Sequence, residues 1–240
     1  MHIIRLDEIN STNLYAKSKI NDFADRTIII ADRQTSGRGR FDRSWIDLGD
    51  DNIFMSIILK PSEKFNEIYT NLTQYLSVIL CETIEDYGIS PSIKWPNDVL
   101  INDKKVAGIL SETVMQGTNF NGLVLGAGIN LNSDSEKIKM IKDKEATALN
   151  IELCCEHLDK EEFLNKFLDK FFSKYDQFLN TGFVMIKNEY LNRASFLDKE
   201  ISVKIFNETK SGFVKSVNDS GELVLEKDKK ELVLTMGDIL

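Results

Sequence analysis

The sequence predicts an α+β fold in which helices pack against a mixed β-sheet, followed by a small all-β unit. Runs of β-branched residues typical of buried strands stand close together, with short polar turns between several of them. Two long segments instead repeat apolar residues every three or four positions, as a helix with one buried face does. Because adjacent hairpins imply antiparallel pairing, these observations favour α+β over a doubly wound α/β arrangement.

The elements of the first half follow from capping residues, strand-forming runs and helical periodicity. Ser, Thr and Asn in succession are residue types that cap the start of a helix, and glycine commonly follows the end of one. The expected elements are a helix that begins at 11–13, strands over 26–32 and 52–59, and a helix over 68–87 that Gly88 ends.

The second half supplies a hairpin, a long helix and the small β unit. Polar turn residues separate its strand-like runs. The expected elements are two strands within 92–114 around a turn at 102–104, a strand over 122–132 that pairs with them, and a helix over 161–183. After Leu197, short alternating segments take over, so we expect one domain over 1–195 and a second over 196–240.

Size and charge restrict the class of protein. A chain of 240 residues is long enough for a large domain plus a small one, and its net charge of -8 argues against a surface that binds nucleic acid throughout. Its three cysteines form no disulfide framework, and no apolar run reaches the length that spans a bilayer. We therefore expect a cytoplasmic protein that binds neither DNA nor a membrane.

The segment RQTSGRGRFDRSW, residues 33–45, concentrates positive charge in one loop. It holds four of the seven arginines in a chain that otherwise uses lysine. Arginine offers a planar set of donors that grips a carboxylate or a phosphate with two hydrogen bonds. Gly37 and Gly39 let the backbone approach a ligand, and Arg38 and Arg40 can converge on one anion. An RNA-binding loop is the alternative interpretation.

Three further segments are polar or glycine-rich where the neighbouring sequence is apolar. KWPND, residues 94–98, places one cation, one amide and one carboxylate in a turn that proline stiffens, a set suited to a nucleotide with Mg²⁺. KKVAGIL, residues 104–110, combines lysines with small residues that leave room for a ligand. GAGIN, residues 126–130, lacks the complete dinucleotide-binding fingerprint. Taken singly, each also reads as an ordinary turn or strand.

Their order along the chain is specific. STN, then QxxGRGRxxxxW, KWPND, KxAGIL and GxGIN together resemble the bacterial biotin protein ligase family, from Ser11 to about Asn132. The resemblance implies a class II synthetase-like catalytic domain followed by a small SH3-like β-barrel. It also implies that ATP and biotin react, with Mg²⁺ present, to give biotinyl-5′-AMP. Biotin then passes to a lysine of a biotin carboxyl carrier protein, usually that of acetyl-CoA carboxylase.

The resemblance also implies roles for individual residues. The expected biotin site comprises Ser11, Thr12, Asn13, Gln34, Gly37, Arg38, Gly39, Arg40, Lys105 and Gly108. The expected ATP site comprises Arg40, Arg43, Trp45, Lys94, Asn97, Asp98 and Asn130. Arg40 and Lys105 are the expected catalytic groups, because cations at the reacting phosphate stabilise its developing charge. Asp98 is the expected ligand of Mg²⁺, and Arg33 receives no role.

Two features of the family bear on the expected partners. Some members carry an N-terminal DNA-binding domain, but only ten residues precede Ser11, so we expect the monofunctional form. Members of the family can pair through their sheets, so the resemblance is compatible with a homodimer of this chain.

Two rival functions remain open. A lipoate ligase or octanoyl transferase of the same superfamily shares the fold, but usually lacks the GRGR…W and KWPND pair. The transferase also uses a cysteine. An RNA-binding module would use the Arg/Gly loop, with Phe41 and Trp45 as stacking platforms, but would need the basic stripe that this acidic chain lacks.

Overall fold

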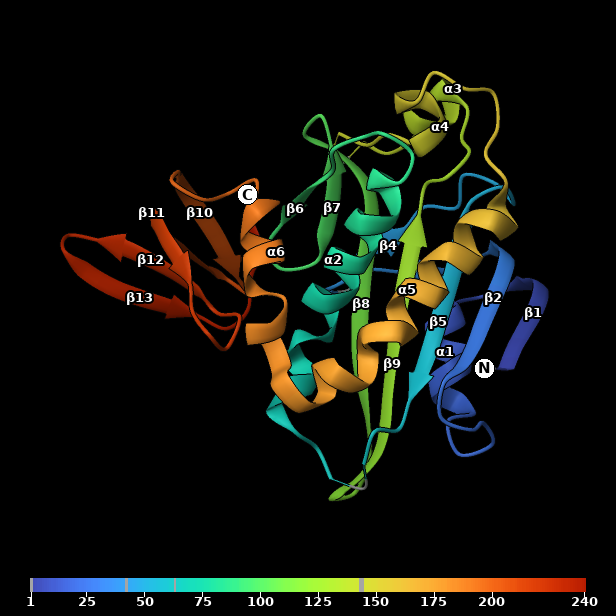
Figure 1. Cartoon of the computed structure of the whole chain (residues 1–240), viewed down its shortest axis with the longest axis horizontal. Coiled ribbons are helices and arrows are strands. Elements are labelled where there is room, and N and C mark those ends of the chain that lie inside the picture. The colour runs from blue at the N-terminus through green and yellow to red at the C-terminus, as the bar shows by residue number, and fades with distance from the viewer. Residues whose placement is uncertain (1, 42, 63, 143–144) are drawn as a thin grey trace.

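The computed structural model describes residues 2–41, 43–62, 64–142 and 145–240, and its centre is a seven-stranded mixed β-sheet (Figure 1). Its strands, in spatial order, are β1 (His2–Ile9), β2 (Thr27–Gln34), β5 (Ile53–Leu59), β9 (Asn119–Ile129), β8 (Lys104–Gln116), β7 (Asp98–Ile101) and β6 (Ser92–Lys94). β1 pairs in parallel with β2, and every other neighbouring pair in this sheet is antiparallel. The expected α+β class with a mixed sheet is confirmed.

Helices cover both faces of this sheet. α2 (Leu72–Glu85) and α5 (Lys160–Thr181) lie on one face, and α1 (Thr12–Ser18) lies on the other (Figure 1). The alternation of strand side chains explains the two layers: Ile28 and Ile30 of β2 join the large core under α2 and α5, whereas Ile29 packs against α1.

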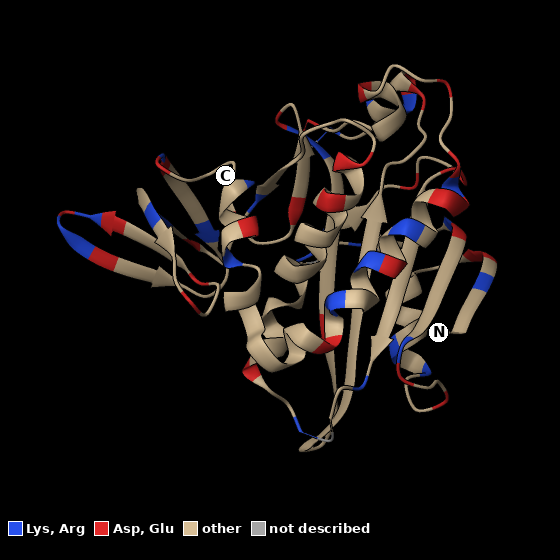
Figure 2. Cartoon of the chain, viewed as in Figure 1, with Lys and Arg blue, Asp and Glu red and all other residues tan. Residues whose placement is uncertain are grey.

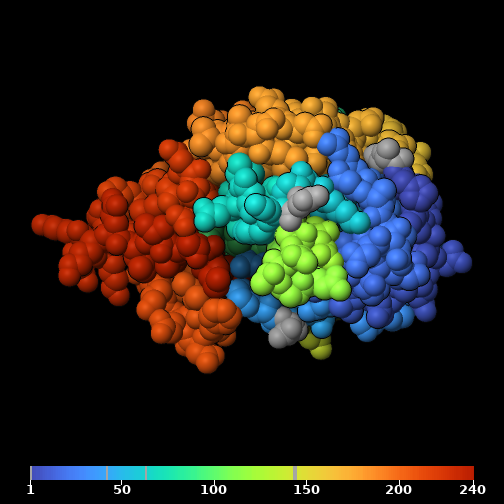
Figure 3. Space-filling view, turned by 90° about the horizontal axis from the view of Figure 1, so that it is seen from below, coloured from blue at the N-terminus to red at the C-terminus, as the bar shows by residue number. Residues whose placement is uncertain are grey.

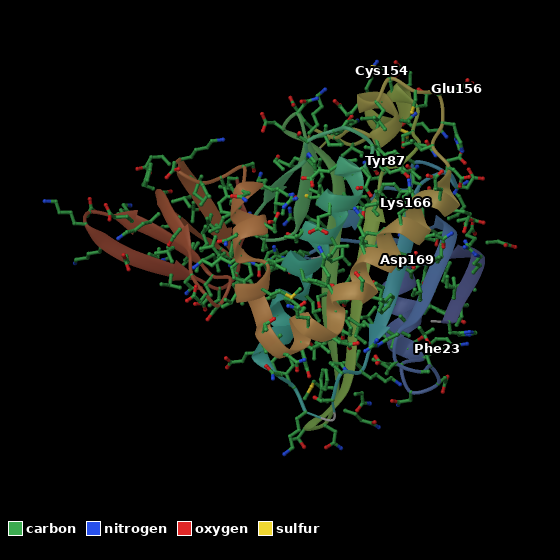
Figure 4. The ribbon with its side chains drawn as sticks, viewed as in Figure 1. Phe23, Tyr87, Cys154, Glu156, Lys166 and Asp169 are labelled. Carbon is green, nitrogen blue, oxygen red and sulfur yellow. The ribbon has the colours of Figure 1, made fainter. Side chains whose placement is uncertain are left out.

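The outer surface of α5 carries charges of both signs. Figure 2 shows Lys or Arg and Asp or Glu interspersed along this helix. In Figure 4, Lys166 and Asp169 extend from it, and Tyr87 lies beside Lys166, whose Nζ is 4.9 Å from the centre of the tyrosine ring. The buried face holds the expected aromatic stripe, so this helix has a structural role.

Three differences from the expected elements concern the seven-stranded sheet and its covering helix. β1 was not predicted; it is an edge strand with half-exposed residues, so it lacks a continuous apolar run. The helix expected over 68–87 begins as the 3₁₀ turn η1 (Glu67–Asn71) and its α-helical part ends at Glu85. The first half of 92–114 is split into β6 and β7 by Trp95, Pro96 and Asn97, with a cis bond before the proline.

A five-stranded antiparallel sheet follows in the last part of the chain. Its spatial order is β13 (Lys230–Leu234), β12 (Leu223–Lys227), β11 (Glu208–Val217), β10 (Glu200–Ile205) and β14 (Asp238–Ile239). The short helices η2 (Gly182–Met185) and α6 (Lys187–Asn192) connect α5 to it. Within the described residues, no helix has both the length and the apolar composition needed to cross a bilayer.

The second sheet is attached to the first through the turn before β12. Gln74 Nε2 donates to Gly221 O at 2.8 Å, and Asn71 Nδ2 donates to Ser220 O at 2.9 Å. Trp95 Nε1 also faces Gly221 O, at 3.4 Å. Gly221 has a φ of +77°, and a Cβ there would lie 2.3 Å from Asn71 Nδ2, so both the turn and its seat on α2 require glycine.

Candidate active site

A cavity lies where the Arg/Gly loop meets the seven-stranded sheet and the five-stranded sheet. Figure 3 shows a recess between the red C-terminal part and the light-green hairpin of β8 and β9. Every residue expected in the biotin and ATP sites lines the cavity except Gly37 and Lys94. Lys94 is the strand partner of Asp98 in the β6–β7 hairpin. Gly37 lies against the backbone of Trp45 within the loop. The sequence motifs therefore converge on one place.

The Arg/Gly loop is folded back on itself by a two-residue pairing of β3 (Gly37–Arg38) with β4 (Ser44–Trp45). Gly39 N–H donates to Arg43 O at 2.7 Å inside this hairpin. A Cβ at Gly37 would lie 2.6 Å from Trp45 O, so any side chain there would force the two strands apart. The loop is thus a defined support for its arginines rather than a free tail.

Trp45 forms a wall of the cavity because glycines on the sheet make room for its ring. A Cβ at Gly108 would lie 2.8 Å from the ring, and one at Gly128 would lie 2.5 Å from it. Lys105 Nζ lies 5.4 Å from the ring centre, within the range of a cation–π contact. Trp45 Nε1 is buried and has no hydrogen-bond partner among the described residues.

Arg40 reaches across the cavity to the second sheet. Its Nη1 donates to Asn97 Oδ1 at 3.0 Å, to Gly237 O at 3.1 Å and to Asp238 Oδ1 at 3.2 Å. Arg43 pairs with the other oxygen of Asp238. Burial lowers the pKa of Arg40, the Asp98 charge opposes this, and the Arg43 charge adds to it. A cation held in such surroundings interacts more strongly with an anion than a cation in water does.

Asp98 and Lys105 form an ion pair on the opposite wall, with 2.7 Å between Asp98 Oδ1 and Lys105 Nζ. Both side chains are largely buried. Asn97 precedes them and is fixed by two bonds to Ile109: its Nδ2 donates to Ile109 O at 2.8 Å, and Ile109 N–H donates to Asn97 O at 3.1 Å. Asn130 is anchored by donation from Nδ2 to Thr147 O at 3.0 Å.

The other end of the cavity is lined by hydroxyl and amide side chains, among them Thr12, Asn13 and Gln34. Thr12 N–H donates to Gln34 Oε1 at 2.8 Å. Ser11 accepts the N–H of Leu14 with its side chain, as the expected helix cap. Asn13 lies over Gly126, where a Cβ would be 2.1 Å from Asn13 Oδ1, so the GAGIN glycine makes room for it.

The structure gives Arg33 the role that the sequence left open. Its Nε donates to Asp47 Oδ2 at 2.9 Å, and the N–H of Gln34 donates to the same oxygen at 2.9 Å. Asp47 Oδ1 accepts the N–H of Gly49 at 2.7 Å. Arg33 is therefore tied to the chain that leaves the loop, and it does not line the cavity.

Three residues near the cavity were missed by sequence reasoning. Ser56 lies in the apolar run of β5, Glu112 lies on β8, and Asp238 lies almost at the end of the chain. A serine inside a buried strand and a glutamate inside a half-buried one carry no distinctive pattern. Asp238 reaches the loop only because the second sheet is folded against the first.

The cysteines lie apart from the cavity. Cys81 is in the middle of α2 and fully buried, and this burial raises the pKa of its thiol far above the usual value, which the nearby charge of Arg193 opposes only in part. Cys154 is exposed and follows α4 (Leu149–Glu152), as Figure 4 shows at the edge of the molecule. No cysteine of the described chain lines the cavity, which disfavours a thiol nucleophile.

Iodoacetamide at pH 8 is expected to label Cys154 within minutes and to leave Cys81 unmodified until the protein is unfolded. The reason is that only an accessible thiolate reacts, and burial withholds both access and charge from Cys81. Peptide mass spectrometry of native and urea-unfolded samples measures this directly. Rapid labelling of native Cys81 would reopen the thiol route.

Ile141, which follows the short helix α3 (Ser135–Ile138), and Ala146 both line the cavity. They close the wall beside Lys105, whose N–H donates to Glu145 O at 2.9 Å. Neither histidine is part of the wall, so the chemistry available there is that of cations, carboxylates and amides.

Known proteins share this arrangement. Residues 5–130 match the family described as "Biotin/lipoate A/B protein ligase family". The chain is 33% identical over 240 residues to the bifunctional ligase/repressor BirA of Bacillus spizizenii, covering 99% of this chain and 73% of that protein. It is 27% identical over 240 residues to the biotin–[acetyl-CoA-carboxylase] ligase of Paracoccus denitrificans, covering 98% of each. The biotin protein ligase of Aquifex aeolicus in complex with biotin and ATP aligns with a TM-score of 0.82 at 26% identity, covering 100% of this chain and 97% of that one.

Proposed function

The chain belongs to the biotin/lipoate A/B protein ligase family, and from that premise we propose that it activates biotin with ATP and transfers biotin to a lysine of a biotin carboxyl carrier protein. The observation that carries this proposal is the convergence of the GRGR loop, KWPND and KKVAGIL on one cavity. The family includes lipoate enzymes, but two relatives aligned over nearly the whole chain, from Paracoccus denitrificans and Mycobacterium tuberculosis, are named biotin–[acetyl-CoA-carboxylase] ligases. The carrier of acetyl-CoA carboxylase is the proposed partner.

The proposed first step forms an acyl-adenylate. A carboxylate oxygen of biotin attacks the α-phosphorus of ATP, the bond from that phosphorus to the bridging oxygen breaks, and pyrophosphate leaves. Negative charge gathers at the phosphorus during attack. Arg38, Arg40 and Lys105 face the cavity and supply positive charge without any proton transfer, which fits a wall with no histidine.

The proposed second step passes biotin to the carrier. The neutral amine of the carrier lysine attacks the acyl carbon, the bond to the AMP oxygen breaks, and the attacking nitrogen loses one proton. This step requires that the adenylate stay bound until the carrier arrives. Arg40 and Arg43, both paired with Asp238 of the second sheet, are placed to retain the phosphate.

The donor set suits Mg²⁺ as a companion of ATP. Asp98 and Asp238 line the cavity with carboxylates, and Asn97 adds an amide oxygen, the ligand types that Mg²⁺ prefers. The described residues contain no group of three or more His, Cys, Asp or Glu able to enclose a metal. The ion would therefore be shared with the phosphates, whose charge it would offset, and we propose Asp98 as its protein ligand.

The proposed division of the chain is a catalytic domain over 1–195 and a domain over 196–240, the latter an SH3-like barrel. The antiparallel order of β10 to β14 supports this. Pairing of two copies through their sheets remains the proposed route to a homodimer, with β1 as the available edge strand.

Exchange of pyrophosphate into ATP tests the function. Biotin is expected to support the exchange, whereas lipoate is expected not to. Exchange with lipoate alone would make the protein a lipoate ligase. Exchange with neither acid would leave the proposal without support, and the RNA-binding alternative would then be tested by titration with labelled single-stranded RNA.

The change Gly128→Ala is expected to raise the KM for biotin or ATP by tenfold or more. Its methyl group would lie 2.5 Å from the Trp45 ring, so the ring must move into the cavity. The matched control is Gly212→Ala, whose methyl group would lie 2.8 Å from Glu226 O in the second sheet. We expect the control to lower the melting temperature while leaving both KM values unchanged. Equal KM values for Gly128→Ala and the unchanged protein would contradict the placement of Trp45.

A further inference from the structure

Glu112 is a carboxylate directly behind the polar end of the cavity. It lies on β8, two residues beyond Leu110, which lines the cavity. Its Oε1 lies 2.6 Å from Lys17 Nζ and 3.4 Å from Arg38 Nη1, and its Oε2 accepts from Asn13 Nδ2 at 3.0 Å. Two of these three partners, Asn13 and Arg38, line the cavity themselves.

The surroundings of Glu112 keep it ionised at neutral pH. Burial by itself would raise the pKa of the carboxyl group. Hydrogen bonds from Lys17 and Asn13, together with the charges of Lys17 and Arg38, outweigh burial and lower the pKa below its usual value. An ionised carboxylate only accepts hydrogen bonds, so it demands a donor from whichever side chain faces it.

That demand fixes the amide of Asn13 in one orientation. Its Nδ2 faces two acceptors, Glu112 Oε2 at 3.0 Å and Leu110 O at 3.3 Å. Its Oδ1 lies 2.6 Å from Ser56 Oγ, which also lies 2.8 Å from Thr12 Oγ1. Because a hydroxyl has one proton and an amide oxygen only accepts, Ser56 gives its proton to Asn13 Oδ1.

A flipped amide would place Oδ1 against two acceptors and is therefore excluded. The oxygen instead lies over Gly126, a residue of the cavity wall, and Ser56 occupies only one of its two lone pairs. At this end of the cavity Asn13 thus presents an acceptor rather than a donor. Biotin carries two ureido N–H groups, whereas the dithiolane ring of lipoate carries none.

We propose that Glu112 is a positioning and specificity residue, which holds the Asn13 oxygen toward the ligand and so favours an acid that bears an N–H group. The proposal rests on the proposed function, because it names how this site would choose biotin. A site built around a hydrogen bond to a ligand discriminates strongly against a ligand that lacks the group, since its own polar atom is then left unpaired.

The first test compares Glu112→Gln with the unchanged protein in pyrophosphate exchange, using biotin and biotin methylated at a ureido nitrogen. The neutral amide at position 112 can face Asn13 with either end and no longer attracts Lys17 and Arg38. We expect the KM for biotin to rise about tenfold or more. The rise should exceed the fall in kcat, and the preference for biotin over the methylated analogue should shrink. An unchanged preference would overturn the proposal.

A matched control separates position from stability. Glu82 lies on α2 with a side chain 18% exposed, against 15% for Glu112, and it pairs with Lys174. Glu82→Gln removes an equivalent charge outside the cavity, so we expect a change in melting temperature without a change in ligand preference. If both variants shift the KM for biotin equally, Glu112 has only a structural role.

The decisive experiment exchanges the two chemical groups. Asn13→Asp alone sets two carboxylates against each other, and we expect it to weaken biotin binding. In the double variant Asn13→Asp with Glu112→Gln, the new amide donates to the new carboxylate, and an acceptor again faces the ligand. The double variant should recover part of the KM and of the preference lost by Asn13→Asp.

The outcomes distinguish the two proposals. If the double variant folds, as judged by circular dichroism, but shows no recovery, the role proposed for Glu112 is wrong. The proposed ligase function is not affected by that result. Absence of biotin-dependent exchange in the unchanged protein would instead remove the proposed function. If Glu112→Gln does not fold, Lys17→Met takes its place. Lys17→Met removes one cation beside Glu112 but leaves the contact between Glu112 and Asn13. We therefore expect its KM for biotin to rise less than that of Asn13→Asp. An equal rise would contradict the proposal.

Discussion

Replacement of Arg40 by alanine is expected to let the protein form biotinyl-5′-AMP but release it about ten to a hundred times faster. Arg40 is buried, and its guanidinium spans the cavity from the loop to Asn97 and Asp238. A bound phosphate would meet a cation that solvent screens poorly, which makes that interaction stronger than one at the surface. Adenylate formation should fall less than retention, because Lys105 and Arg38 stay in place.

The measurement is the rate at which labelled biotinyl-5′-AMP leaves the protein after excess ATP is removed. Arg33→Ala is the matched control, since it removes the same charge at the end of β2, just before the loop, from a side chain that pairs with Asp47 outside the cavity. Equal release rates for the two variants would show that loop charge in general, rather than the Arg40 contact, retains the adenylate. The free acid should also appear sooner with Arg40→Ala, as the released anhydride hydrolyses.

The part of the fold with strong periodicity was predictable from the sequence, and the part defined by long-range pairing was not. The strand over 53–59 is marked by a continuous run of buried residues. The helix over 160–181 is marked by buried residues that recur every three or four positions. β1 has no such run, because it is an edge strand and its identity depends on parallel pairing with β2. A half-exposed segment of this kind is not distinguished by local propensity from an ordinary loop.

The cavity residues also divide into those that local sequence patterns predicted and those that depend on long-range contacts. Side chains within compact motifs were expected, since a cluster such as KWPND is unusual against an apolar background. Ser56, Glu112 and Asp238 act through contacts with residues far away in sequence, and each looks ordinary among its neighbours. Most side chains that line the cavity were therefore predictable from the sequence, while the groups that orient them required the folded chain.

The change Lys105→Met is expected to slow adenylate formation by about a hundredfold to a thousandfold. Methionine keeps an unbranched side chain of similar length, but it removes the charge that faces the Trp45 ring and would meet the attacked phosphate. It also leaves Asp98 with one cation fewer on its Oδ1. Transfer from chemically prepared biotinyl-5′-AMP to the carrier should be affected less, because the phosphorus is no longer under attack in that step.

The neighbouring change Lys104→Met provides the control, since Lys104 pairs with Glu152 at 3.7 Å and lies outside the cavity wall. Single-turnover formation of labelled adenylate, followed with both variants, gives the comparison, and melting temperatures report any loss of folding. Similar rates for the two variants would contradict a catalytic role for Lys105. If Lys105→Met slows only the transfer of biotin to the carrier, Lys105 acts in that second step and not in adenylate formation. Because Lys105 contacts both Asp98 and Trp45, its charge joins the carboxylate proposed for Mg²⁺ to the aromatic wall of the cavity.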